Sequence, residues 1–176
     1  LNPGDTLRVV DRTVSKLAVG LGSNIMLIRR PLDFASSPEW IKIGGGNSRT
    51  EQWTIPNPIL FEGGAFGGEC KTMTWSNDGD ALYIGTQNGH VYRLSNLNAV
   101  TDSLNNGDVD SLTPPPNPVM VSNTECIVRM TRLGYFANNY ITGLSIDPFN
   151  GNRLCVTTGG YFNGTHVYVC DSARTS

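Results

Sequence analysis

Short runs of apolar residues, each ended by a cluster of Gly, Asn or Asp, follow one another along most of the chain. The clearest stretch is residues 73–94, where three such runs are separated by Asn77-Asp78-Gly79 and by Asn88-Gly89. Runs of this length between turn residues are typical of short strands joined by tight turns. The pattern therefore predicts three consecutive antiparallel strands, and the fold class that it predicts is all-β.

The Asn88-Gly89 dipeptide predicts a hairpin of defined geometry. Both residues tolerate the positive φ that a two-residue type I′ turn demands. Such a turn sets Gln87 opposite His90, and it follows that Ile84 faces Arg93 across the hairpin.

The same arrangement recurs in two other places. One copy covers residues 144–157 and continues after a wider loop, where His166-Val167-Tyr168 repeats His90-Val91-Tyr92. A degraded copy covers residues 17–27, with a further strand expected at 7–10. An internal repeat of this kind indicates a fold built by stacking one structural unit. Gly20, Gly85 and Thr157 mark the same position in the three copies.

Each unit is closed by a fourth short strand, at residues 40–43 and 127–130. Four antiparallel strands per repeat make one blade of a β-propeller. We therefore expect residues 1–176 to form a partial β-propeller of about two and a half four-stranded antiparallel blades with long loop insertions. Blade one is expected at about 7–43, blade two at about 70–133 with an insertion at 96–124, and an incomplete blade three at about 140–176.

The number of blades implies that the propeller is completed from elsewhere. Two or three blades cannot close a ring that usually contains about 4 to 8. The remaining blades are therefore expected in the same or another chain. The sequence begins with Leu1 and not Met, which we interpret as a processed protein or an excerpt of a longer one. Runs such as 82–84 and 167–169 are apolar on both faces, as expected for sheets that neighbouring blades cover on both sides.

Composition and charge narrow the classes of partner. The chain has 20 Gly, 10 Pro and only 16% charged residues, which favours turns over helices. Its net charge is −2 and no stripe of Lys and Arg is present, so we expect no nucleic-acid partner. The longest apolar run, Ile25–Ile28, is far shorter than the roughly 18 to 20 residues that span a bilayer, so no membrane insertion is expected.

Four cysteines at positions 70, 126, 155 and 170 lack the spacing of a zinc site. An even number fits an oxidising compartment, although buried thiols fit almost as well. Superposing the last copy on the clearest one sets Cys155 opposite Cys170, at about 4.5 to 5.5 Å between Cβ atoms. A cross-strand disulfide between them and a pair of packed thiols are the two alternatives.

No residues converge on a catalytic, cofactor or metal site in the sequence. Asp78, Asp80 and Asp147 all fall at turn positions, where Asp hydrogen-bonds its own backbone, so we interpret them as turn formers. His90 and His166 occupy equivalent places beside turns and are interpreted as structural, with metal binding or pH sensing as the alternative. We therefore expect no cofactor, and an enzymatic role is disfavoured.

Two stretches carry a family resemblance. Trp75–Gly79 followed by Leu82–Tyr92 resembles the pattern of WD40-like and BNR-like β-propellers, although the closing Trp-Asp and the Asp-box order are absent. Ile141–Pro148 with Cys155–Tyr161 and His166–Tyr168 resembles the propellers of large secreted bacterial proteins. Together with residues 16–40, these stretches are similar to exported surface proteins of Bacteroidota, many of them delivered by type IX secretion. The resemblance implies an extracellular or cell-surface location.

In that bacterial group, Asp-Ser/Thr-apolar tripeptides are O-glycosylated, and the resemblance therefore implies candidate acceptor hydroxyls in this chain. Four tripeptides match, and their hydroxyl residues are Thr6, Ser103, Ser111 and Ser172. A glycoprotein is the expectation that follows.

Three functions fit these observations. The first is a non-catalytic binding or scaffold propeller of an exported protein, a type IX secretion substrate or component, which contacts a protein or a glycan. The second is part of a propeller-type glycoside hydrolase whose catalytic residues lie outside this stretch. The third is a cytoplasmic interaction hub. Fold alone does not choose between them, because propellers have many functions.

Overall fold

The computed structural model describes residues 16–29, 31, 40–44, 66–99, 128–160 and 164–175, and these residues form ten strands and one short 3₁₀ helix. No α-helix is present among them. The strands make three antiparallel sheets, which confirms the all-β class. The expected strand at 7–10 and most of the two long segments, 44–68 and 96–124, lie outside the described residues.

The three sheets follow the order of the chain. Sheet 1 contains β1 (Lys16–Leu21), β2 (Asn24–Arg29) and β3 (Trp40–Gly44). Sheet 2 contains β4 (Cys70–Trp75), β5 (Leu82–Thr86), β6 (His90–Ser95) and β7 (Arg129–Tyr135), with the 3₁₀ helix Leu97–Ala99 after β6. Sheet 3 contains β8 (Tyr140–Ile146), β9 (Leu154–Gly159) and β10 (Val167–Cys170).

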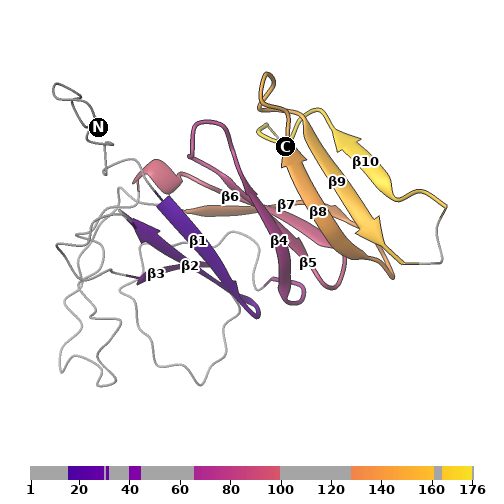
Figure 1. The fold of residues 1–176 in the computed structure, drawn as a ribbon, viewed down its shortest axis with the longest axis horizontal. Coiled ribbons are helices and arrows are strands. Elements are labelled where there is room, and N and C mark those ends of the chain that lie inside the picture. Colours follow the sequence, from indigo (N-terminus) through magenta and orange to yellow (C-terminus); the bar gives the residue numbers. More distant parts are fainter. Residues whose placement is uncertain are drawn as a thin grey trace, which may run out of the picture.

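Sheet 2 lies between the other two sheets (Figure 1). One apolar cluster joins sheets 1 and 2 and includes Leu27, Ile84 and Leu94. A second cluster joins sheets 2 and 3 and includes Tyr83 and Ile141. Since successive side chains of a strand point to opposite faces, the two clusters bury both faces of sheet 2.

The repeat is visible in the strand register. In sheet 2, β4 pairs with β5 with a bulge between Cys70 and Thr72, after which Thr72 faces Gly85. In sheet 3, β8 pairs with β9 with a bulge between Ile141 and Gly143, after which Gly143 faces Thr157. A bulge inserts one residue at a defined place, so its recurrence aligns the two sheets residue by residue. Gly85 and Thr157 are therefore equivalent, as the sequence predicts.

A second recurrent bulge aligns sheet 1 with sheet 2. Ile25 faces Gly44 and Met26 faces Lys42 in sheet 1. The corresponding pairs in sheet 2 are Val91 with Gly134 and Tyr92 with Arg132. Because Gly20 faces Ile25 and Gly85 faces Val91, Gly20 and Gly85 are equivalent too. The three marked positions lie in three different sheets.

The expected fourth strands are present, with one change of boundary. The strand predicted at 40–43 is β3, which pairs with β2. The strand predicted at 127–130 is β7, which begins at Arg129 and continues to Tyr135. The turn between β8 and β9 is one residue longer than that between β4 and β5, since Asp147 N–H donates to the carbonyl of Arg153 and Ser76 N–H to that of Ala81.

The predicted geometry of the β5–β6 hairpin is wrong. Ile84 faces Tyr92, not Arg93. The loop has three residues, with Gly89 at φ 80° and its N–H donating to the carbonyl of Thr86. A three-residue loop that ends in a left-handed glycine is the next most common hairpin after the two-residue types. His90 N–H donates to Thr86 Oγ1 at 3.1 Å and so helps to close this longer loop.

Candidate functional site

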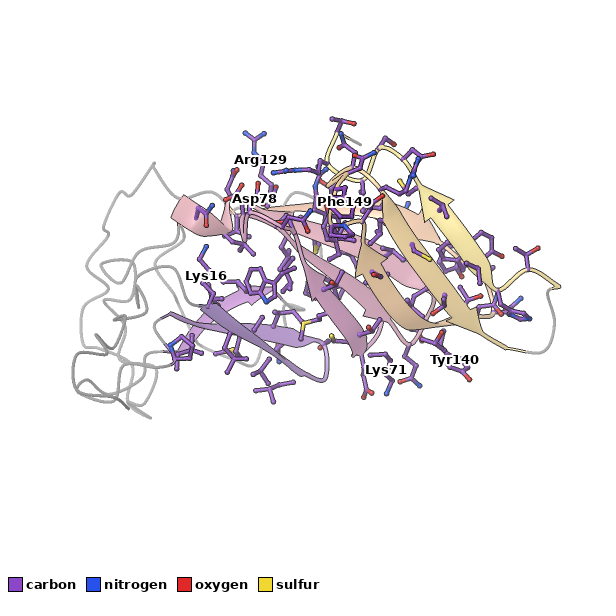
Figure 2. All side chains as sticks on the ribbon, turned by 45° about the horizontal axis from the view of Figure 1, so that its top comes forward. Lys16, Lys71, Asp78, Arg129, Tyr140 and Phe149 are labelled. Carbon is purple, nitrogen blue, oxygen red and sulfur yellow. The ribbon has the colours of Figure 1, made fainter. Side chains whose placement is uncertain are left out.

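The two ends of the stacked sheets differ in chemistry. Asp78 and Phe149 lie at one end, on the β4–β5 and β8–β9 turns, and we call this the turn end (Figure 2). Lys71 and Tyr140 lie at the opposite end, near the β5–β6 hairpin, and we call this the hairpin end (Figure 2).

The carboxylates of the turn end accept hydrogen bonds from nearby backbone N–H groups, and those of Asp78 and Asp147 do so within their own turns. Asp78 Oδ1 accepts hydrogen bonds from Ser76 Oγ at 2.7 Å and from Asp80 N–H at 3.2 Å. Asp80 Oδ1 accepts the N–H of Asn98, and Asp147 Oδ1 accepts the N–H groups of residues 149 and 150. The bonds of Asp78 and Asp147 are typical of Asp in turns, and the interpretation as turn formers is confirmed for these two residues. Asp80 instead joins its turn to the 3₁₀ helix after β6.

Polar contacts tie the turns of neighbouring sheets together. Asn77 Nδ2 donates to the carbonyls of Asp147 and Pro148 at 3.1 and 3.0 Å. Arg174, after β10, forms an ion pair with Asp78. The hydrogen bond from Ser76, followed by that from Arg174, lowers the pKa of Asp78 from 3.8 to about 2. Asp78 is therefore charged at neutral pH and links sheets 2 and 3.

A hollow of about 290 Å³ lies beside these turns and is lined by Lys16, Trp75 and residues 76–79. Lys16 Nζ donates to the carbonyl of Gly79 at 3.1 Å and also bonds to Asn98 Oδ1. The ammonium group of Lys16 therefore joins sheet 1 to sheet 2 through these hydrogen bonds. We interpret its role as structural.

An aromatic stack occupies the hairpin end. The His90 ring stacks on Tyr135, with centroids 4.5 Å apart, and lies 5.7 Å from the Tyr92 ring. Gly67 lies directly against the imidazole, since a Cβ on it would be 2.2 Å from His90 Cδ2. Burial, with the charge of Arg132 as a smaller cause, lowers the pKa of His90 below 6.5. The neutral ring is thus part of the packing at this end.

His90 and His166 have equivalent positions but different surroundings. Thr157 faces Val167 just as Gly85 faces Val91, so the residues before the two valines correspond. His90 is half-buried in the stack, whereas His166 is exposed. Among the residues that the structure describes, no group of three or more His, Cys, Asp or Glu could hold a metal ion.

The predicted placement of Cys155 opposite Cys170 is wrong. Cys155 faces Val169, and Cys170 faces Leu154. Because neighbouring strand residues point to opposite faces, this shift of one residue directs the two thiols to opposite sides of sheet 3. Cys170 packs on the cluster shared with sheet 2, and both cysteines are free. The register therefore does not favour a cross-strand disulfide between Cys155 and Cys170.

Of the four predicted glycosylation sites, only Ser172 is described; Thr6, Ser103 and Ser111 lie outside the described residues. Ser172 is exposed two residues after the end of β10, and its hydroxyl lies 3.8 Å from Cys170 Sγ. Its modification stays a prediction.

The outer face of sheet 3, turned away from sheet 2, is a surface that the sequence analysis did not single out. It carries Cys155, Thr157, Val167 and Val169, which alternate with residues of the shared cluster. Val167 and Val169 are 60% and 59% exposed. The sequence analysis expected run 167–169 to be covered on both faces, and for this reason it did not predict an exposed surface here.

In comparisons with known proteins, no family model, curated protein or solved structure matches the chain. No helix in the described part of the chain is long and apolar enough to cross a membrane.

Proposed function

We propose that this chain is part of a β-propeller and acts as a non-catalytic binding or scaffold module. The observation that carries the proposal is the equivalence of sheets 2 and 3. The face of sheet 2 that sheet 3 covers contains Tyr83, Gly85 and Val91, and the register matches these residues to Cys155, Thr157 and Val167 on the outer face of sheet 3.

The equivalent faces differ in burial. Val91 is 1% exposed because sheet 3 packs on it, and Val167 is left at 60%. Val167 and Val169 form an exposed apolar pair on this face, beside Thr157 and Ser145, and exposed apolar residues that lie together often mark an interaction site. The occupant that we propose for the outer face is a further sheet of the same repeat, packed on sheet 3 as sheet 3 packs on sheet 2. Repetition of this contact is how a propeller is built.

The chemistry of the turn end supports a binding role over a hydrolytic one. Hydrolysis of a glycosidic bond usually needs two carboxylates that flank the substrate. Asp78, Asp80 and Asp147 instead accept hydrogen bonds from their own turns or from Asn98. Phe149, at 97% exposure, stands beside them as a contact residue for a protein or a glycan. We further propose that the protein is exported to the cell surface, as the family resemblance implies.

One experiment separates binding from turnover. The chain is applied to an array of cell-surface glycans and assayed in parallel on chromogenic glycosides. We expect retention without hydrolysis, and Phe149→Ala should weaken the retention more than Leu17→Ala, which changes an exposed apolar residue of sheet 1. Turnover that is lost in Asp78→Asn or Asp147→Asn would contradict the non-catalytic role.

A second experiment tests the outer face of sheet 3. Sedimentation velocity is measured over a concentration series for the chain and for the double variant Val167→Lys, Val169→Lys. We expect the chain to self-associate through the uncovered face and the double variant to stay monomeric. The matched control is Leu17→Lys, which should self-associate as the unchanged chain does. Equal association of the chain and the double variant would overturn the assignment of this face.

A further inference from the structure

The free edge of β10 contrasts with the equivalent edges in the other sheets. In sheet 1 the outer edge of β2 is covered by β3, and in sheet 2 the outer edge of β6 is covered by β7. The register aligns β10 with β6, and no described strand pairs with its outer edge. Unpaired edges expose N–H and C=O groups that can pair with another strand.

The open backbone groups can be assigned to residues. Thr158 N–H donates to the carbonyl of His166 at 2.9 Å, so His166 turns its backbone groups toward β9. Along an antiparallel strand, successive residues turn their backbone N–H and C=O groups alternately to one neighbouring strand and to the other. Val167 and Val169 therefore turn their N–H and C=O groups toward the open edge.

The strands that cover the equivalent edges share a sequence pattern. Trp40-Ile-Lys-Ile-Gly44 and Met130-Thr-Arg-Leu-Gly134 both consist of a large apolar residue, Ile or Thr, a basic residue, Ile or Leu, and glycine. They also share a register. In sheet 1, Gly44 faces Ile25 and Lys42 faces Met26. In sheet 2, Gly134 faces Val91 and Arg132 faces Tyr92. In both strands the residue between the basic residue and the glycine forms the bulge.

We propose that the open edge of β10 binds an extended antiparallel strand of the pattern large apolar, Ile or Thr, Lys or Arg, Ile or Leu, Gly, with its glycine opposite Val167 and its basic residue opposite Tyr168. β10 and β6 share the tripeptide His-Val-Tyr, so a strand suited to β6 meets the same residues on β10. This proposal goes beyond the previous one, because the strand joins the edge of sheet 3 whereas a further sheet covers its face.

The occupant comes from outside these 176 residues. A basic residue followed by Ile or Leu and then Gly occurs in the sequence only at 42–44 and 132–134, and β3 and β7 already use both copies. The residue of β7 that faces Ser95 is Arg129, and the β10 counterpart of Ser95 is Asp171. Asp171 already forms an ion pair with Arg153 Nε at 2.8 Å, and a basic residue at that position of the incoming strand would face the same carboxylate as a second partner.

The test is disulfide trapping with a synthetic peptide of residues 127–135 that carries Met130→Cys as a mixed disulfide with thionitrobenzoate. In the proposed register this cysteine faces Cys170, as Met130 faces Leu94 in sheet 2. The Cys170 thiolate then attacks the peptide sulfur and releases thionitrobenzoate. We expect a covalent adduct that peptide mapping assigns to Cys170, formed at least tenfold faster than with a scrambled peptide.

Two controls test the register and the backbone pairing. A peptide with Thr131→Cys directs its thiol to the other face and should react no faster than the scrambled peptide. In the chain, Val169→Pro removes an N–H that faces the open edge, a position where proline is tolerated, and should abolish the rate advantage. Val169→Thr keeps the N–H and should preserve the advantage, and circular dichroism checks that both variants fold.

Equal rates for the matched and scrambled peptides, or an adduct at Cys70, Cys126 or Cys155 in place of Cys170, would overturn the proposal. The face of sheet 3 is tested separately by Val167→Lys, Val169→Lys and sedimentation, so the failure of one proposal is distinguishable from the failure of the other.

Discussion

Sheets 2 and 3 are built from the same repeat, yet they differ in how many of their faces are covered by a described neighbour. Sheet 2 has neighbours on both faces, and Tyr83 at its centre is fully buried. Sheet 3 has a described neighbour on one face only, and the equivalent residue, Cys155, is half-exposed. The same strand pattern thus makes a central sheet or a terminal one, and the difference lies in what packs against it.

The contrast extends to the backbone. A Cβ at Gly85 would lie 2.4 Å from Ile141 Cγ2 and 2.7 Å from its Cβ, so sheet 3 approaches closely at this point. Gly20 makes the corresponding approach to Cys70, at 2.9 Å from Sγ. The third copy has Thr157 in this place, where no described sheet approaches. Glycine is needed only where the neighbouring sheet is in contact.

The largest expected effect comes from truncating the buried centre of sheet 2. Tyr83→Ala removes a fully buried ring and should lower the free energy of unfolding by about 3 to 5 kcal/mol, because a large cavity remains. The matched change in sheet 3, Cys155→Ala, should cost less than about 1 kcal/mol. Urea unfolding followed by tryptophan fluorescence measures both. Similar losses in the two variants would break the contrast between the sheets.

The next effect comes from adding a methyl group between the sheets. Gly85→Ala should lower the free energy of unfolding by about 1 to 3 kcal/mol, because Ile141 and Thr72 must move to admit the new Cβ. Thr157→Ala, at the equivalent position, loses the hydroxyl contacts with Thr142 Oγ1 and with the carbonyl of Gly143 and should cost less than about 1 kcal/mol. Thermal unfolding of both variants gives the comparison, and a neutral Gly85→Ala would contradict the close packing.

A smaller effect concerns the ion pair between the sheets. Asp78→Asn should lower the free energy of unfolding at neutral pH by less than about 1 kcal/mol, since both partners are more than one-third exposed and water screens them. The folded pKa of Asp78, about 2, lies below its usual 3.8, so this stabilisation is present above about pH 4 and is lost as the pH falls toward 2. Acid titration of stability should show this loss in the unchanged chain only. A variant that follows the same acid profile would contradict the link.

The smallest effect separates the two histidines. Burial lowers the pKa of His90 below 6.5, so the fold favours its neutral form. In the unfolded chain His90 binds a proton more readily than in the folded one. The stability that depends on neutral His90 is therefore present above about pH 6.5 and is lost as the pH falls below that value. His90→Gln should remove this acid loss, whereas His166→Gln, on the exposed equivalent, should retain it. Chemical denaturation at a series of pH values measures both, and an unchanged profile in His90→Gln would exclude the assignment.

Much of the fold was predictable because it depends on neighbours along the chain. Turn residues and apolar runs located β4, β5, β6, β8 and β9, and the repeated His-Val-Tyr tripeptide aligned the last two sheets. The turn roles of Asp78 and Asp147 followed from their positions next to glycine or proline. These features rest on local backbone preferences, which the residues themselves carry.

The hairpin register was not predictable in the same way. Asn88-Gly89 suits a two-residue turn, but it also suits the longer loop that forms, in which only Gly89 has positive φ. The contact of Gly89 with the backbone of Phe136 and Asn139 accompanies the longer loop. The one-residue error then passed by superposition to Cys155 and Cys170 and produced a disulfide prediction that the register contradicts.

Composition, turn residues and the repeat were enough to establish an all-β chain made of similar antiparallel units, because strands and turns form from preferences within a few residues. Register and burial were decided by the packing of whole sheets. A shift of one residue moves every side chain of a strand to the other face, and only contacts between distant segments select one register. For the same reason, the exposure of Val167 and the burial of Val91 follow from the sheet that lies beside each strand and not from the tripeptide that they share.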